Sequence, residues 1–346
     1  MKVVVTVDTE ADDQWRHGAP LTTRNVAWWA PFQALCERHE APPTYLLTSE
    51  IVADERAVAF LAPLAGRGAA EAGAHLHPWT TPPFGVEPGL AWNDAAHTYP
   101  CHLGEELLAA KLRTLTAQIE AAFGAPPTSF RAGRFGLDAA GARLLAGLGY
   151  IVDSSVTPSV SWAGNPGRPG WGGGPDFRRH TAYPFRVVGT GAPGAGTGSG
   201  GAAGRRSLVE LPVTILPTYA ATRRCRALRE HWEARPLRLA RRGLHAWRRP
   251  QPLWFRPRPE YGAGDLLALL DEAERCHLPY AVFMVHSSEL MPGASPYRPT
   301  PASVDELLSL LEGLFGAARR RGHAFCTLSA AGRELAAFDR LPAGAL

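Results

Sequence analysis

The sequence predicts an α/β fold, specifically an irregular (β/α)7-type barrel, and three observations support this prediction. The chain has 346 residues, of which 45% are hydrophobic and 20% charged, a balance that supplies a large core and excludes a disordered or fibrous protein. Short β-branched runs alternate with longer helical patterns, as in βα units around a parallel sheet. Seven or eight such units fit one barrel domain of this length. An open doubly wound sheet is the alternative, although no G-x-G-x-x-G motif follows the first strand.

The expected strands are short apolar runs, in chain order Val3–Val7, Thr44–Thr48, Ala72–His77, Thr128–Ala132, Tyr150–Asp153, Leu208–Val213, Ala281–His286 and Ala324–Leu328. Between them lie stretches with helical patterns: Val26–His39, Glu55–Gly66, Glu105–Phe123, Asp138–Gly147, Asp265–Cys276 and Val304–Arg321. Together they predict a single barrel domain over residues 1–340.

Two parts of the chain interrupt this rhythm. Residues 160–206 are rich in Gly and Pro and are expected to form loops within the domain, with Gly189–Gly204 as a mobile connection. Residues 222–250 are expected to form a basic helical insertion. The segment 221–250 holds ten arginines against two acidic residues, whereas the whole chain carries a formal charge of only +4. That small total does not favour a nucleic-acid partner. The mixture of arginine, leucine and tryptophan instead suggests peripheral contact with a membrane or glycolipid, and an arginine-rich composition is the simpler alternative.

The cysteines and the first residues bear on the compartment. The five cysteines are widely spaced and none belongs to a C-x-x-C pair, which favours reduced, packed thiols. The first apolar run, VVVTV, is too short for a signal peptide, and no window reaches the length of a membrane span. We therefore expect a cytoplasmic protein.

Polar side chains follow the expected strands at the points where catalytic residues gather in βα barrels. Asp8 and Glu10 end the first strand, and His75 and His77 end the third. Alternate strand residues point to the same face, so each pair can project together. Two imidazoles with one or two carboxylates suit Zn²⁺ or a similar divalent ion.

Other strand ends carry further candidates. Arg131 and Arg134 follow the fourth strand, Asp153 the fifth and His286 the seventh. Trp79, like Trp92 and Trp162, falls in an expected loop, where it can present a flat aromatic face to a ligand. Core packing is the alternative for each tryptophan. The segment AHTYPCH (96–102) is interpreted as a structured loop rather than as a second metal site.

Six sequence blocks, in this order, carry a specific resemblance: VDTE (7–10), EAGAHLHPW (71–79), FRAGRFG (130–136), LGYIVDSSVTP (148–158), LVELPV (208–213) and FMVHSSEL (283–290). Over roughly residues 1–330 the chain resembles the polysaccharide deacetylase family, carbohydrate esterase family 4. It looks most similar to a branch with Asp-Thr-Glu and His-Leu-His-Pro-Trp segments. The resemblance implies an irregular β/α barrel that removes N- or O-acetyl groups from sugars with a divalent metal.

The resemblance also implies roles for individual residues. Asp8 matches the general base, His75 the first metal histidine, and Arg131 the arginine that orients the base. His286 matches the general acid, and Asp153 lies in a block that lines the substrate groove.

Two positions depart from the family pattern. Thr9 stands where the family has a metal-binding acid, and Trp79 stands where it has a second histidine. Glu10 and His77 are the expected replacements. With Trp79, Arg134 and Asp153 as substrate contacts, the predicted protein is a zinc-dependent deacetylase of an acetylated carbohydrate. A catalytically inactive glycan-binding barrel, or a glycoside hydrolase using Asp8 with Asp153 or Glu210, remains an alternative.

Overall fold

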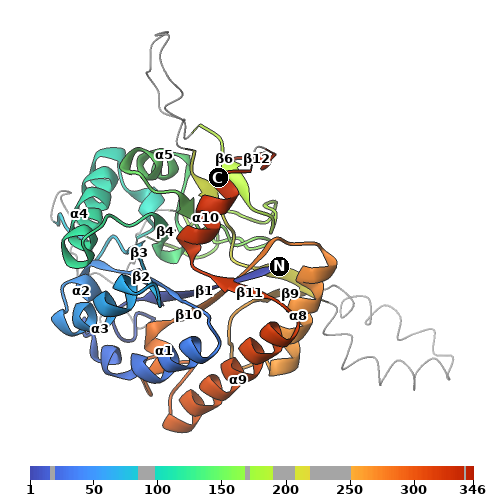
Figure 1. Cartoon of the computed structure of the whole chain (residues 1–346). Coiled ribbons are helices and arrows are strands. Elements are labelled where there is room, and N and C mark those ends of the chain that lie inside the picture. Colours follow the sequence, from blue (N-terminus) through green and yellow to red (C-terminus); the bar gives the residue numbers. More distant parts are fainter. Residues whose placement is uncertain (16–19, 85–97, 168–171, 190–206, 219–250, 339) are drawn as a thin grey trace, which may run out of the picture.

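The computed structural model describes residues 1–15, 20–84, 98–167, 172–189, 207–218, 251–338 and 340–346 (Figure 1). Most of the expected mobile connection Gly189–Gly204, the basic insertion 222–250 and Trp92 lie outside these residues.

A curled, mostly parallel sheet lies at the centre of the molecule and helices surround it (Figure 1). The strand order is β10-β1-β2-β3-β4-β5-β7-β6-β12, and β11 pairs with β1. The parallel strands of this path are β1 (Lys2–Thr9), β2 (Thr44–Leu47), β3 (Glu71–Leu76), β4 (Ser129–Ala132), β5 (Val152–Asp153), β7 (Val209–Glu210) and β10 (Tyr280–His286). These strands correspond to the seven units that the sequence predicts, so the barrel-type fold is confirmed.

The segment that follows β7 hydrogen-bonds to β10, and so links the two outer strands of the parallel series. Thr214 N donates to Val282 O of β10 (3.2 Å), and Met284 N of β10 donates to Phe255 O (3.1 Å). Thr214 and Phe255 lie beside a separate antiparallel pair, β8 (Ile215–Thr218) and β9 (Gln251–Trp254). At the other margin, β6 (Phe185–Val187) runs antiparallel to β7 and pairs with β12 (Ala343–Gly344).

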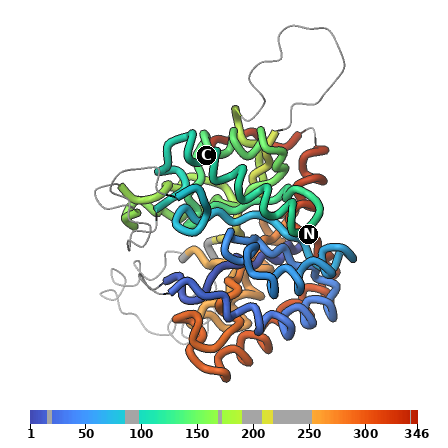
Figure 2. The backbone as a smooth tube through the Cα atoms, turned by 90° about the vertical axis from the view of Figure 1, so that its left-hand side faces the viewer, coloured from blue at the N-terminus to red at the C-terminus, as the bar shows by residue number. Residues whose placement is uncertain are grey.

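Strand β1 is the centre of the sheet because three strands pair with it. Its run of valines is fully buried. β10 pairs along Lys2–Asp8, β2 pairs with Thr6–Thr9, and β11 (Ala324–Cys326) pairs with Lys2–Val4. Figure 2 shows the N-terminal segment (blue) beside residues 251–320 (orange), although they lie far apart in the sequence.

The helices lie around the sheet (Figure 1), with bounds α1 (Trp29–Arg38), α2 (Ser49–Val52), α3 (Glu55–Gly66), α4 (Glu105–Phe123), α5 (Ala139–Leu148), α8 (Ala263–Arg275), α9 (Pro301–Arg320) and α10 (Leu328–Ala336). Short 3-10 helices are η1 (Arg24–Trp28), η2 (Pro100–His102), η3 (Gly133–Phe135) and η4 (Ser287–Leu290). Local sequence explains several starts. Asp54, Asp138, Thr300 and Thr327 each accept a hydrogen bond from a first-turn backbone N–H, which is the usual function of an N-cap residue.

Strand ends are where prediction and structure differ most. β5 and β7 are shorter than expected. β7 ends at Glu210, because Leu211 N bonds to Asp153 O (2.8 Å) in register but Val213 N bonds to Val156 O (3.0 Å), one residue out of register. β5 begins only at Val152, where Ile151 N and Val152 N share Thr128 O as acceptor. The expected strand Ala324–Leu328 is wrong at its end, since Thr327 caps α10 instead. His77 lies one residue beyond β3. Six further elements were not predicted from the sequence: α2, α10, β6, β8, β9 and β12.

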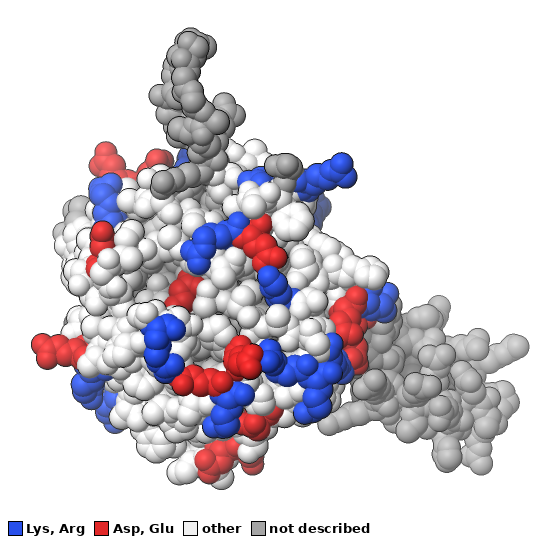
Figure 3. All heavy atoms as spheres, in the orientation of Figure 1, with Lys and Arg blue, Asp and Glu red and all other residues white. Residues whose placement is uncertain are grey.

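The surface has mixed charge. Figure 3 shows basic and acidic side chains next to one another on the face that carries α1, α9 and α10. Ion pairs there include Lys2 with Glu334 (2.5 Å) and Arg38 with Glu312 (2.7 Å). None of the described helices is both long and apolar enough to cross a membrane. The four described cysteines, Cys36, Cys101, Cys276 and Cys326, are free thiols.

Candidate active site

The parallel strands bring the predicted polar residues to one end of the barrel. Asp8 of β1 pairs in register with His286 of β10, and His75 of β3 pairs with Arg131 of β4. β2 and β3 separate β1 from β4. Even so, Arg131 Nη1 donates to Asp8 Oδ1 at 2.5 Å, so this ion pair crosses the barrel interior. The site is therefore assembled from strands that lie across the barrel from one another.

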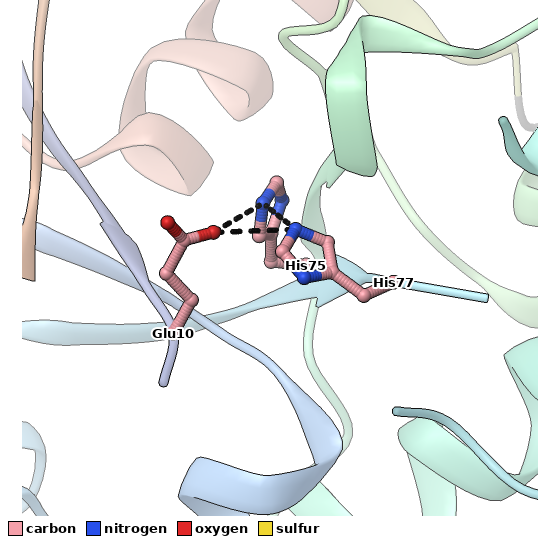
Figure 4. Close-up of side chains that lie close together, drawn as sticks. All are labelled: Glu10, His75 and His77. Carbon is pink, nitrogen blue, oxygen red and sulfur yellow. Dashed lines mark hydrogen bonds and ion pairs between the residues drawn. The ribbon is translucent and has the colours of Figure 1, made fainter. Parts of the chain in front are cut away.

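Glu10, His75 and His77 form a compact cluster whose ligand atoms lie within 4.8 Å of one another (Figure 4). His75 Nε2 and His77 Nε2 are 3.0 Å apart, and Glu10 Oε2 lies 3.9 Å and 3.3 Å from these two nitrogens. Ligands at 2.0–2.1 Å from a tetrahedral ion would be about 3.3 Å apart. The measured edges scatter around that value, so the donor set fits a small divalent cation.

The tautomer of His75 agrees with ligation. His75 Nδ1 lies 2.8 Å from Arg131 O, and because a carbonyl can only accept, this nitrogen carries the proton. Nε2 therefore presents its lone pair to the cluster, in the arrangement typical of metal-binding histidines. Burial lowers the pKa of His75, which also favours the neutral imidazole.

The charge around Glu10 favours a cation. Burial and the nearby carboxylates of Asp8, Glu50 and Glu289 raise the pKa of Glu10 well above its ordinary value. A buried carboxylate among other carboxylates is costly unless a positive charge compensates it. A divalent ion between Glu10 and the two imidazoles would supply that charge.

The backbone of Glu10 is held from two sides. Glu10 N donates to Ser287 Oγ (3.1 Å), and Asn25 Nδ2 donates to Glu10 O (3.0 Å). Asn25 is itself fixed by Asp12, whose carboxylate accepts from Asn25 N (3.0 Å) and Asn25 Nδ2 (2.7 Å). This network positions Glu10 without contacting its carboxylate.

Asp8 has the environment of an ionised base. Burial alone would raise its pKa, but the positive charge of Arg131, together with His75 and His286, outweighs burial and lowers it. Arg131 is fully buried and held in place, because its Nε donates to Ser154 O (2.8 Å) and its Nη2 donates to Ser154 Oγ (3.0 Å). Asp8 therefore remains ionised and oriented inside the barrel.

His286 faces Asp8 from the other side. His286 Nε2 lies 3.9 Å from Asp8 Oδ2, and its Nδ1 lies 3.2 Å from Glu289 Oε1. Arg256 Nη2 donates to the same Glu289 oxygen (3.0 Å), and the ring of Trp15 contacts the imidazole edge-on at 5.0 Å. Glu289 accordingly orients the ring so that Nε2 points toward Asp8.

Three of these neighbours were not predicted from the sequence. Glu289 follows His286 by three residues and accepts its backbone N–H (3.3 Å), the spacing of a capping box. That spacing could have identified it. Arg256 and Trp15 come from loops distant in sequence, and no local pattern marks them.

The turn after β4 brings the backbone close to His77. A Cβ on Gly133 would lie 2.5 Å from His77 Cδ2 and 2.5 Å from Leu76 O, so this position requires glycine. Arg134 and Phe135 follow with φ of +54° and +59°, a strained conformation for residues with side chains. The Arg134 guanidinium lies over the Tyr99 ring at 4.1 Å and Nη2 donates to Pro166 O (3.1 Å).

The tryptophans differ in their surroundings. Trp79 stacks on His77 with ring centroids 4.2 Å apart, and its Nε1 donates to Gln14 Oε1 (3.0 Å). It thus lies directly beside the metal cluster. Trp162 instead stacks on Phe135 (5.4 Å) and meets Trp254 edge-on (6.2 Å) in an aromatic group.

Asp153 lies deeper than the other predicted substrate contacts. It is fully buried, and its oxygens accept from Ser155 Oγ (2.6 Å) and Ser155 N (3.2 Å). Glu210 lies beside it on β7, and burial and the Asp153 carboxylate raise the pKa of Glu210 well above its ordinary value. Substrate binding by Asp153 stays a prediction.

In the loop AHTYPCH, the described residues pack as the sequence predicts. His102 Nε2 lies 3.1 Å from Gly173 O, and Tyr99 Oη donates to Asn165 O (3.1 Å). His97 lies outside the described residues.

Comparison with protein-family models and with curated protein sequences gives no match. Solved structures do match. A candidate polysaccharide deacetylase from Mycobacterium smegmatis aligns with a TM-score of 0.55 and 14% identity, covering 100% of this chain and 93% of that chain. A candidate glycoside hydrolase/deacetylase from Parabacteroides distasonis aligns with a TM-score of 0.54 and 12% identity, covering 96% and 70%. A candidate polysaccharide deacetylase from Pseudomonas aeruginosa PAO1 aligns with a TM-score of 0.51 and 12% identity, covering 96% and 89%.

At these identities the matches concern the fold. The expected resemblance to polysaccharide deacetylases is confirmed at this level, over nearly the whole chain.

Proposed function

We propose that this protein is a metal-dependent hydrolase that removes an acetyl group from the nitrogen or oxygen of a carbohydrate. One observation carries the proposal. A cation-binding cluster, Glu10 with His75 and His77, lies beside a buried ionised carboxylate, Asp8, which faces the imidazole of His286. A ligand set, a base and an acid are the three parts that metal-assisted acyl hydrolysis requires.

The roles follow from the geometry. When bound by Glu10, His75 and His77, a divalent cation supplies Lewis acidity toward an acyl oxygen and toward water, and Zn²⁺ suits this donor set. Asp8 accepts the proton of the attacking water, and Arg131 keeps Asp8 ionised.

His286 completes the reaction from the opposite side. Its Nε2 protonates the leaving nitrogen or oxygen, while Glu289 holds Nδ1 and stabilises the charged imidazole. Trp79 is proposed as an apolar wall for the sugar, since it stacks on a ligand histidine at the same centre. Arg134 lies on the adjacent turn and is proposed as a second sugar contact.

The shared fold supports a carbohydrate substrate, because two of the three structures described above are candidate polysaccharide deacetylases. The glycoside hydrolase alternative has less support. Asp153 and Glu210 are fully buried on neighbouring strands, and Asp8 is paired with Arg131. A glycoside hydrolase needs two carboxyl groups that flank the scissile bond.

The test measures acetate release and metal content together. The purified protein is stripped with a chelator, reloaded with Zn²⁺, and assayed on N-acetylglucosamine oligomers and O-acetylated xylo-oligosaccharides. We expect activity to disappear on stripping and to return on loading. His75→Ala should lose both zinc and activity, while His39→Ala, a control at the end of α1, should retain both.

Two results would overturn the proposal. A stripped protein as active as the loaded one would exclude a metal-dependent mechanism. Sugar binding without turnover by the loaded protein would instead support the glycan-binding alternative.

A further inference from the structure

Lys111 is unusual both in the sequence and in the structure. The chain contains only two lysines, Lys2 and Lys111, and uses arginine for its other basic side chains. Lys2 is 40% exposed and pairs with Glu334 at the surface. Lys111 lies in the middle of α4 and is 0% exposed. A buried lysine in an arginine-rich chain indicates that this position needs the shape of an ammonium group.

The Lys111 ammonium binds three backbone carbonyls of one loop. Nζ donates to Pro78 O (3.0 Å), Thr81 O (2.5 Å) and Pro83 O (2.9 Å). An ammonium has three donors around one point, and these converging acceptors match it, whereas the guanidinium of arginine is a planar fork. Burial lowers the pKa of Lys111 to about 8, so the side chain is mostly charged at neutral pH.

This loop continues directly from the metal cluster. Thr80 N and Thr81 N donate to His77 O (3.2 and 3.0 Å), and Trp79 stacks on the His77 ring. His77 lies beyond the end of β3, so the loop, rather than the sheet, holds its backbone.

His75 is held differently. It belongs to the β3 ladder opposite Arg131, and its ring is bonded to Arg131 O (2.8 Å). The two histidines of the cluster therefore depend on different supports, and the support of His77 includes Lys111.

We propose that Lys111 is a positioning residue for the metal centre, holding the loop 78–83 so that His77 presents its Nε2 to the cluster. The inference rests on the proposed function, because it assigns the purpose of that support to metal binding. It also predicts a larger effect on His77 than on His75.

The test compares Lys111→Met with a matched variant on the same helix. Met keeps the length of the stem and removes the three donors. Thr116→Val, also on α4, is the control, because Thr116 Oγ1 bonds to Leu112 O (2.7 Å) and to the hydroxyl of Tyr150 (2.9 Å), and neither partner belongs to the loop 78–83. The dissociation constant for Zn²⁺ is measured by competition with a chromophoric chelator. Residues that support metal ligands typically contribute 10–100-fold to affinity.

We expect Lys111→Met to weaken zinc binding by about 10–100-fold, and Thr116→Val to leave it near wild type even where its melting temperature falls. The visible spectrum of the Co²⁺-loaded protein should change in Lys111→Met alone. If Lys111→Met lowers the melting temperature but leaves both zinc affinity and the Co²⁺ spectrum unchanged, Lys111 is purely structural and the inference is wrong. Lys111→Arg, which keeps the charge but not the three converging donors, is measured in the same way if the Met variant does not fold.

A second readout separates this inference from the proposed function. The imidazole NMR signals of His75 and His77 are recorded in metal-free protein. Lys111→Met should shift the signals of His77 more than those of His75, whose ring contacts His77 but is also held by Arg131 O. Should the wild-type protein bind no zinc, the proposed function fails, and an unshifted His77 signal would then reject the positioning role as well.

Discussion

Two carboxylates at opposite ends of the barrel, Glu71 and Glu10, have opposite surroundings. At the amino end of β3, Glu71 accepts hydrogen bonds from Thr44 Oγ1 (3.2 Å), Ser129 Oγ, Ser329 N (2.9 Å) and Ser329 Oγ (2.6 Å). At the other end, Glu10 faces imidazoles and further carboxylates. Neutral hydrogen-bond donors stabilise a buried carboxylate without any ligand. Several carboxylates close together destabilise the folded protein until a bound cation compensates their charge.

The same contrast occurs within a single loop. Asp12 lies two residues after Glu10, and its carboxylate accepts from Thr22 Oγ1 (2.7 Å), Arg24 N (3.1 Å) and Asn25 N (3.0 Å). Those hydrogen bonds outweigh burial and lower the pKa of Asp12, whereas the pKa of Glu10 is raised. Asp12 and Glu10 are both buried carboxylates, and they differ in the hydrogen-bond donors around them.

The largest effect should follow the loss of the base at the functional end. Asp8→Asn keeps the side-chain shape and removes the proton acceptor, so turnover should fall by about 10²–10⁴-fold while zinc still binds. Initial rates and zinc content are measured together. Asp138→Asn, a matched change at the N-cap of α5, is the control. Full activity in Asp8→Asn would contradict the assignment of the base.

Removal of the cation beside Asp8 should change the pH dependence. Arg131 lowers the pKa of Asp8 in the folded protein, so in Arg131→Met that pKa rises. The base works above its pKa, and the acidic limb of the rate profile should therefore move to higher pH by about 1–3 units. Arg131→Lys keeps a positive charge and should shift the limb less. A limb that does not move in Arg131→Met would show that a different group controls it.

A single added methyl group should disturb the cluster more than the fold. In Gly133→Ala the new Cβ would press against His77 and the Leu76 carbonyl, and zinc affinity should fall by about 10–100-fold. Gly66→Ala, where nothing lies within 4 Å of the added Cβ, is the matched control. Equal zinc affinity in both variants would contradict this prediction. It would mean that His77 can shift away from the added methyl group without loss of metal binding.

The smallest effect on activity should come from a change at the end of the barrel that holds Glu71. Ser329→Ala removes one donor from Glu71, and the free energy of unfolding should fall by about 1–3 kcal/mol. Turnover by the folded protein should not change, because Glu71 lies at the opposite end of the strands. Denaturant unfolding and initial rates check the two halves of the prediction. A loss of turnover that exceeds the loss of folded protein would show that the ends are coupled.

Much of this architecture was predictable from the sequence, for a simple physical reason. β-branched runs and helical patterns recur with little interruption, so the strands and main helices were located within a few residues. Because parallel strands end at one edge, Asp8, Glu10, His75, Arg131 and His286 could be expected to gather there before any geometry was known.

The contacts that could not be predicted from the sequence join segments that lie far apart along the chain. Lys111 acts through backbone carbonyls of another segment, and Arg256 and Trp15 reach His286 from loops distant in sequence. No spacing in the sequence encodes such contacts, since they depend on how the chain closes. No sequence pattern marks the early end of β7 either, where the hydrogen-bond register with the segment after β5 shifts by one residue at Val213.

The pairing of β1 has a consequence for synthesis of the chain on the ribosome. β1 ends at Thr9 and is made well before two of its partners, because β10 ends at His286 and β11 ends at Cys326. At typical translation rates of about 5–20 residues per second, the valines of β1 would wait roughly 15–55 s for β10. During that time an apolar strand with an unpaired edge is exposed to other chains. The nascent chain is therefore expected to depend on chaperones, and truncation before β10 should yield aggregates rather than a smaller folded protein.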